Sequence, residues 1–202
     1  NHFGGKSGAN LVEVSPQNEQ DDERLRNIVI ERNMFKGAAT VGNEILVSGM
    51  DIALRDNIFN MSSGTMAYGA QVTQRGIEPA PTGIEAYNNS CFSSSGAYNG
   101  APSCIYLANS VTASTVQNTL TYFPSQSNCN TVANNGTGNT VSNNTSNCKI
   151  ANPGFTNASG SFSLASDFRP STNYTGGINV PVFEDFFGTP WAGSWDLGAV
   201  HH

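Results

Sequence analysis

A short motif that joins an asparagine to apolar residues recurs through the first 150 residues, and it restricts the possible fold more than any other feature. The chain begins with it as "NHF" (Asn1 to Phe3), and it returns as "NMF" at Asn33 and "NIF" at Asn57. Aligned on the asparagine, the recurring positions are Asn1, Asn33, Asn57, Asn89, Asn118 and Asn144, which lie 32, 24, 32, 29 and 26 residues apart. A constant motif at variable spacing indicates stacked coils of equal circumference with loops of unequal length.

Short stretches of alternating apolar and polar residues lead up to each asparagine after Asn1, for example "NEILVSGM" from Asn43 and "GMDIALRDNIF" from Gly49. Two or three such strands per coil, separated by Gly, Asn, Ser and Pro, predict a parallel β-solenoid. A β-sandwich would also suit the strand spacing, but it gives no reason for one polar residue to recur at the same point. In a solenoid these asparagines stack, and their amides bond one another in a ladder.

The two-residue period of a strand predicts which side chains face the core. The inward positions are Ile28, Ile30, Ile52, Leu54, Ile84 and Ala86 before the asparagines, and Val12, Val14, Ile45, Val47, Ala70, Val72, Ile105 and Leu107 on the other strand. Outside, Glu31, Arg55 and Tyr87 are expected to stack in consecutive coils, and Glu13, Leu46, Gln71 and Tyr106 to do the same on another face.

Four cysteines allow three disulfide connectivities, and pairing between neighbours, Cys91 with Cys104 and Cys129 with Cys148, is the one we expect. Free thiols or small core residues are the alternative. A zinc site is disfavoured, because no pair has the spacing of two to four residues that such sites use and no histidine lies near. Disulfides would place the protein outside the cytosol, either secreted or on the cell surface.

Charge and hydropathy exclude two classes of partner. Only 12% of residues are charged and the formal net charge is -6, which argues against nucleic acid. No apolar run approaches the roughly 20 residues of a membrane span. These properties predict a protein that neither follows phosphate backbones nor crosses a bilayer.

The coil pattern resembles the right-handed parallel β-helix proteins of the pectate-lyase-like superfamily. "IEAYNNSCF" (Ile84 to Phe92) is similar to the "I-x-V-Y-N-N-T" signature of their secreted bacterial members. The tail, from "NPGF" at Asn152 to "DLGA" at Asp196, resembles the closing segment that such proteins carry, although Trp191 stands where that pattern often has arginine. The resemblance implies an all-β, right-handed parallel β-helix of about five coils over residues 1–150 and a closing segment over 151–202, packed on the last coils.

The start of the chain lies inside the repeat, because Asn1 matches the turn of a coil whose earlier strands are absent. An open coil would expose unpaired backbone groups and apolar side chains. We therefore expect either further N-terminal coils of a parent protein or a capping partner at this end.

The resemblance implies a polysaccharide as the partner, bound or cleaved by a lyase or hydrolase. The outward or loop residues that could serve as acid, base or charge partner are Glu13, Arg55, Arg75 and Glu85, although no two glutamates occupy matching positions of neighbouring coils. Gln71, Tyr87 and Tyr106 are the candidates for sugar contact, and Asp21 and Asp22 could hold calcium, the one cofactor that the sequence suggests. The alternative is a non-catalytic adhesin, matrix component or tail-fibre segment, in which these are ordinary solvated charges.

Overall fold

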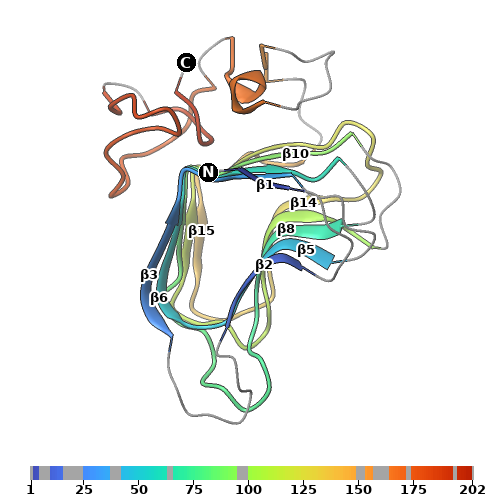
Figure 1. Ribbon diagram of the computed structural model, residues 1–202, viewed down its shortest axis with the longest axis vertical. Coiled ribbons are helices and arrows are strands. Elements are labelled where there is room, and N and C mark those ends of the chain that lie inside the picture. The colour runs from blue at the N-terminus through green and yellow to red at the C-terminus, as the bar shows by residue number, and fades with distance from the viewer. Residues whose placement is uncertain are drawn as a thin grey trace.

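The described part of the chain forms three parallel β-sheets and one short 3-10 helix (Figure 1). The computed structural model describes residues 2–4, 10–15, 25–36, 42–62, 66–94, 100–148, 153–156, 164–171, 174–192 and 195–201. Sheet A contains β1 (His2–Gly4), β4 (Met34–Lys36), β7 (Ile58–Asn60), β10 (Ser90–Phe92) and β13 (Leu120–Tyr122). Sheet B contains β2 (Asn10–Val14), β5 (Gly42–Val47), β8 (Met66–Val72), β11 (Ser103–Leu107) and β14 (Asn130–Asn134). Sheet C contains β3 (Arg26–Glu31), β6 (Met50–Arg55), β9 (Glu85–Tyr87), β12 (Thr115–Gln117) and β15 (Thr140–Ser142).

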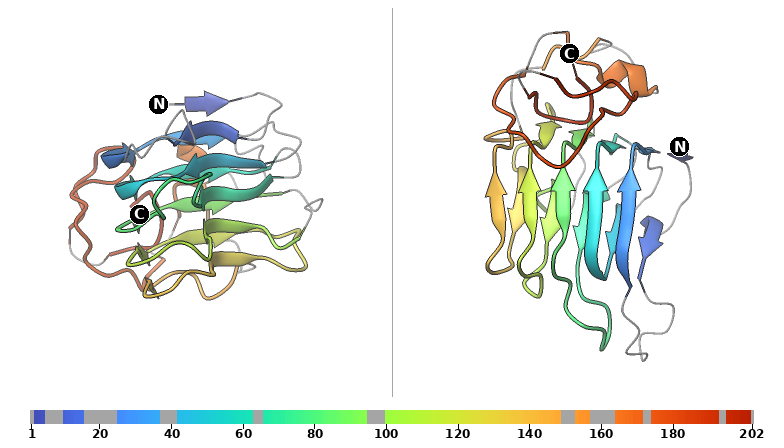
Figure 2. Two further views of the ribbon diagram at one scale, coloured as in Figure 1. Left: turned by 90° about the horizontal axis from the view of Figure 1, so that it is seen from below. Right: turned by 90° about the vertical axis from the view of Figure 1, so that its left-hand side faces the viewer.

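From β2 onward, the chain visits the sheets in the fixed order B, C, A, and we call one such circuit a coil. Each strand pairs in parallel with the strand of the same sheet in the next coil, so the strands of a sheet stack side by side (Figure 2). This arrangement is compatible with the predicted β-helix.

The space between the three sheets is filled by the side chains that the two-residue period predicts to point inward. Ile45, Val47, Ile52, Leu54 and Ile105 are completely buried in one apolar cluster. Phe35 and Phe59 stack in it with ring centroids 5.1 Å apart. Stacking of the short strands buries this apolar surface, and each Å² removed from water stabilises the fold by roughly 25 cal/mol.

The asparagine ladder is present and buried. The side-chain oxygen of Asn57 accepts from the backbone and side-chain nitrogens of Asn33, at 3.1 and 3.3 Å. Asn89 accepts in the same way from Asn57, at 3.1 and 3.2 Å. In the fourth coil the ladder position belongs to Thr119, whose backbone N–H donates to Asn144, so the expectation that Asn118 is a ladder residue is corrected by one position.

Asn118 belongs instead to a second row, one residue before the ladder, in which every backbone is left-handed. The φ angles are 52° for Arg32, 51° for Asp56, 51° for Asn88, 58° for Asn118 and 53° for Asn143. Asn and Asp tolerate this conformation better than most residues, which explains their frequency in the row. The left-handed residue turns the chain sharply from sheet C into sheet A and aims its own side chain away from the core.

Both disulfides join neighbouring cysteines, as predicted. Cys91 in β10 bonds Cys104 in β11, and Cys129 bonds Cys148. The first bridge lies inside the main apolar cluster between sheets A and B, with both cysteines fully buried. It ties one corner of the third coil to the next coil.

The C-terminal segment lies along the side of the stacked coils, above sheet A (Figure 2). Phe155, Phe168 of the short helix η1 (Ala165–Phe168) and Leu197 form a second apolar cluster with Ile58 and Leu120, whose side chains face outward from sheet A. The sequence placed this segment on the last coils, whereas its contacts extend to the first.

An extended stretch, residues 176–184, crosses the left-handed row from the last coil to the first, and we call it the strap. Asn143 donates to the carbonyl of Gly176 at 3.2 Å, and Asn118 donates to that of Ile178 at 2.7 Å while accepting its N–H at 3.0 Å. At the other end Arg32 binds Glu184 at 2.9 Å. The side chains of the row thus act as a series of anchors for the strap.

Candidate functional site

The outer face of sheet B brings together four of the residues singled out in the sequence. Glu13, Leu46, Gln71 and Tyr106 are in register across β2, β5, β8 and β11, as the strand period predicts. Tyr106 stacks on Tyr68 with ring centroids 4.3 Å apart and an angle of 18° between the rings. Leu46 differs from the expectation of an exposed side chain, because it is only 4% exposed.

A row of amides crosses three coils beside this aromatic pair. Asn43 donates to Asn10 on β2 at 3.0 Å and to Gln71 on β8 at 2.5 Å. Asn10 in turn donates to the Glu13 carboxylate at 3.2 Å. The amides therefore hold one another in fixed orientations along the stacking direction.

Glu13 and Arg75 form an ion pair at 3.4 Å, although they belong to different coils. Ser15 donates a further hydrogen bond to Glu13 at 3.0 Å. Both charged side chains are a little over one-third exposed, so the pair adds little to stability. The pair places a carboxylate whose charge is balanced by an arginine at one end of the amide row.

The other predicted residues lie on sheet C, away from this face. Arg55 pairs with Glu31 at 3.1 Å, as expected from their register, and Glu85 is exposed one position before Ala86. Tyr87 points outward in register with Arg55, but it is only 6% exposed because Val180, Val182 and the two tryptophans cover it. Burial, followed by the charge of Glu85, raises the pKa of Tyr87. Tyr87 therefore packs against the C-terminal segment and is not an open sugar platform.

The four candidate catalytic residues are thus divided between two faces, Glu13 with Arg75 on one and Arg55 with Glu85 on the other. The calcium candidates Asp21 and Asp22 lie outside the described residues. Among the residues that are described, no group of three His, Cys, Asp or Glu side chains is placed to hold a metal ion. In the same part of the chain, no helix is long and apolar enough to cross a membrane.

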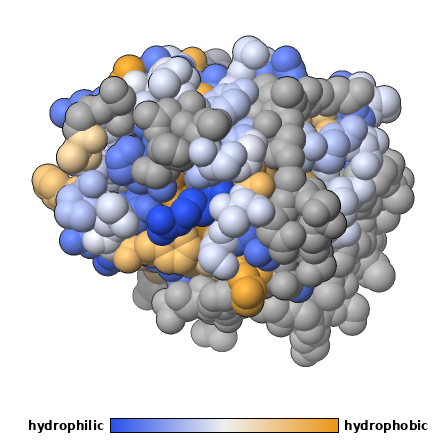
Figure 3. All heavy atoms as spheres, turned by 90° about the horizontal axis from the view of Figure 1, so that it is seen from above, coloured by the Kyte–Doolittle hydropathy of each residue, from blue (hydrophilic) through white to orange (hydrophobic). Residues whose placement is uncertain are grey.

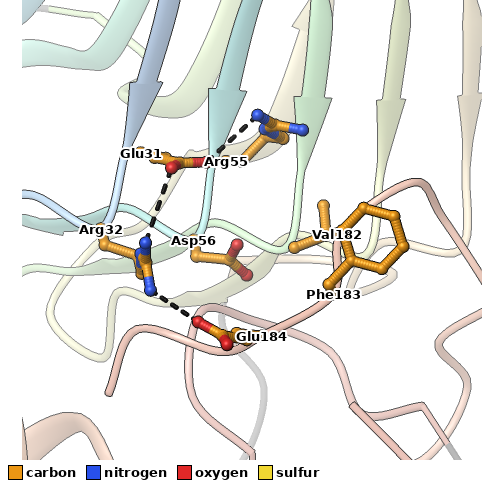
Figure 4. A pocket seen from close by; sticks show the side chains of 7 residues that line it. All are labelled: Glu31, Arg32, Arg55, Asp56, Val182, Phe183 and Glu184. Atoms are coloured by element: carbon orange, nitrogen blue, oxygen red, sulfur yellow. Dashed lines mark hydrogen bonds and ion pairs between the residues drawn. The ribbon is translucent and has the colours of Figure 1, made fainter. Parts of the chain in front are cut away.

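A cavity of about 320 Å³ lies between sheet C and the strap, and of the residues that line it only Arg55 was a candidate site residue in the sequence (Figure 4). Arg32 and Asp56 from the left-handed row meet Glu184 from the strap there, and Asp56 lines this half-open cavity. Arg55 lines the cavity too and donates to the carbonyl of Pro181 at 3.3 Å. The only sequence signal was the recurrence of Asp, Asn or Arg directly before the ladder asparagines.

Asp56 has a strongly perturbed pKa. Its side chain is 1% exposed, and burial raises the pKa from 3.8 to about 8, with the nearby charges of Asp185 and Glu31 acting in the same direction. The side chain of Asn88 and the charge of Arg55 lower the pKa only in part. Asp56 is consequently a neutral carboxylic acid at neutral pH, able to donate as well as accept a hydrogen bond.

Two surfaces are therefore candidate sites: the amide and tyrosine face of sheet B, and the cavity beneath the strap. The strand period predicted Glu13, Gln71 and Tyr106 on the first surface, but it missed Asn10, Asn43 and Tyr68. The second surface depends on contacts between segments more than 100 residues apart. The chain matches no protein-family model, no curated protein and no solved structure.

Proposed function

We propose that this protein is an extracellular β-helix protein that binds a polysaccharide along the outer face of sheet B without cleaving it. The observation that supports this most is the amide row Asn10, Asn43 and Gln71, which runs across three coils beside the stacked Tyr68 and Tyr106. The pattern of parallel sheets and buried asparagines is compatible with the pectate-lyase-like proteins that the sequence resembles.

A polymer suits this face because the chemical groups repeat with the coils. Neighbouring parallel strands lie about 4.8 Å apart, so a chain laid along the stacking direction would meet Asn10, Gln71 and the two tyrosines in turn. Asn43, only 6% exposed, holds the two flanking amides in place. Amides donate and accept hydrogen bonds, as sugar hydroxyls do, and tyrosine offers an apolar ring with a polar end. The oriented amides lose little further freedom on binding, which favours affinity.

The division of the charged residues supports binding without cleavage. Glycoside hydrolysis needs two carboxyls about 5 to 10 Å apart, and the sheet B row offers Glu13 alone, already held by Arg75, Asn10 and Ser15. Lyase chemistry needs a free base beside a cation that neutralises the uronate. The only cation described next to this row, Arg75, is paired with Glu13.

An extracellular location fits the two disulfides, which persist in oxidising surroundings. They would be reduced in most cytosolic compartments. This part of the proposal is tested by fractionating the source cells and locating the protein with an antibody.

Binding is tested by affinity electrophoresis through gels that contain neutral or acidic polysaccharides, with reducing ends and unsaturated uronates measured in parallel. We expect retardation by at least one polymer, no cleavage, and roughly tenfold weaker binding for Gln71→Ala and Tyr106→Ala, since each loses on the order of 1.4 kcal/mol. Glu85→Gln, on the outer face of sheet C, is the matched control and should bind normally.

Two results would contradict the proposal. Cleavage of a polymer would show an enzyme. No retardation by any polymer, or equal retardation of all variants, would leave the structural or adhesive role as the better description.

A further inference from the structure

A second cavity, of about 690 Å³, adjoins the one that contains Asp56, and the two share Val182 and Phe183 of the strap. Its walls come from the C-terminal segment: Asn179, Val180, Pro181, Val182, Phe183, Trp191 and Trp195. Seen from above, the C-terminal side of the molecule shows hydrophobic patches directly beside strongly hydrophilic ones (Figure 3). One half of this double cavity is therefore charged and the other aromatic.

The aromatic half is built from the only two tryptophans in the chain. Trp191 and Trp195 stack with ring centroids 5.1 Å apart and an angle of 13° between the rings. The ring centroid of His201 lies 5.1 Å from that of Trp191. The indole N–H of Trp191 is buried and has no hydrogen-bond partner among the described residues. Phe183, between the two halves, is 84% exposed, which is unusual for a phenylalanine that lines a cavity.

The charged half contains a buried carboxyl group, one oxygen of which lacks a partner. Asp56 is 99% buried, yet its Oδ1 atom meets no donor or acceptor within the described part of the chain. The surrounding charges are mutually paired: Arg32 with Glu31 and Glu184, and Arg55 with Glu31. A buried carboxyl oxygen without a partner is costly, and a bound ligand would supply the missing hydrogen bond.

We propose that the two cavities together form a binding site for a short, neutral saccharide, separate from the face of sheet B. The apolar face of a sugar ring would lie on Phe183 and the tryptophans, and its hydroxyls would reach Asp56 and the paired charges. A ring with one apolar side and several hydroxyls is the ligand class that needs both halves at once.

The other ligand classes fit less well. An anion would find both arginines already paired and three carboxyl groups, Glu31, Asp56 and Glu184, around them. A metal ion would need ionised ligands, and no metal-binding group of His, Cys, Asp or Glu occurs among the described residues. A purely apolar ligand would leave Asp56 and the indole N–H of Trp191 unpaired.

The test uses intrinsic tryptophan fluorescence, because both tryptophans line this site and no other tryptophan contributes to the signal. Cellohexaose, xylohexaose, mannohexaose, chitohexaose and hexagalacturonate are titrated into the whole chain. We expect a saturable change in emission with at least one neutral oligosaccharide and none with hexagalacturonate. No saturable change with any neutral oligosaccharide, or a response to hexagalacturonate alone, would overturn the proposal.

Phe183→Ala tests the aromatic contact without disturbing the fold, since this side chain is largely exposed. We expect at least tenfold weaker binding and an unchanged melting temperature. Phe187→Ala is the matched control, because Phe187 is an exposed phenylalanine of the same segment that does not line either cavity. Equal affinities of the two variants would refute the assignment.

The outcome is independent of the sheet B face. Gln71→Ala should lose retention on polysaccharide gels but keep its tryptophan titration, whereas Phe183→Ala should do the reverse. A tryptophan response that disappears in Gln71→Ala would show one shared site and overturn the separate site proposed here.

Discussion

Replacement of Asp56 by asparagine should stabilise the protein by an amount that grows with pH. In the folded state burial raises the pKa of this carboxyl to about 8, whereas in the unfolded chain it titrates near 3.8. Between these values the folded protein holds a proton that the unfolded chain has released. Stability therefore falls as the pH rises from about 4 to about 8, and asparagine removes that dependence.

The magnitude follows from the shift. One pKa unit corresponds to about 1.36 kcal/mol, so the difference between Asp56→Asn and the parent should grow by roughly 1.4 kcal/mol per pH unit. The unfolded pKa lies roughly 3 units below pH 7. The stability difference between Asp56→Asn and the parent should therefore be about 4 kcal/mol larger at pH 7 than at pH 3. Asparagine keeps the left-handed backbone without new strain, as Asn88, Asn118 and Asn143 show in the same row.

The assay is equilibrium unfolding in urea at half-unit steps from pH 5 to pH 9, under conditions that keep the disulfides intact. Asp51→Asn is the matched control: Asp51 also has a left-handed backbone, with φ of 53°, but its side chain is exposed. A difference between Asp56→Asn and the parent that stays constant from pH 5 to pH 8 would refute the reasoning, because it would mean that the buried carboxyl does not hold its proton.

Two further predictions concern the ladder. Asn57→Ala removes the acceptor for the backbone and side chain of Asn33 and the donor to the carbonyl of Ile30. We therefore expect the free energy of unfolding in urea to fall by about 2 to 4 kcal/mol. Asn128→Ala, at an exposed position, is the control, and an equal loss in the two variants would contradict the prediction. Thr119→Asn should restore the missing rung and raise stability by about 1 kcal/mol, since the Thr119 hydroxyl is buried without a partner among the described residues. Thr119→Ser is the control, and equal melting temperatures of the two variants would argue against the ladder continuing there.

The sequence predicted the parallel strands, the inward side chains and the disulfide pairs because each depends on a local or repeating pattern. Strand alternation fixes which of Ile52 and Ala53 faces the core, and it does so in every coil alike. The error at Asn118 arose because asparagine suits both the ladder and the left-handed row. The adjacent pairs Asn88 with Asn89 and Asn143 with Asn144 contain the signal that there are two rows.

The cavity beneath the strap could not be predicted in the same way. Burial of Asp56 and Tyr87 depends on Val180, Val182 and Glu184, which come from a segment without a repeat of its own. Neither periodicity nor composition gives the path of such a segment over the surface. The division of the charged candidates has a different origin, because Glu13 lies on β2 of sheet B whereas Arg55 and Glu85 lie on β6 and β9 of sheet C.

The length of the strap matches the number of coils that it crosses. Its anchored residues advance by two for each neighbouring coil between Asn143 and Asn118, and the run from Gly176 to Glu184 covers the whole row back to Arg32. Two extended residues reach about 6.6 Å, more than the 4.8 Å between strands, so there is slack but not enough to skip a coil. Solenoids of this type that gain or lose one coil by duplication or deletion would have to change the strap by about two residues as well. We therefore expect the number of coils and the length of the strap to vary together among such proteins.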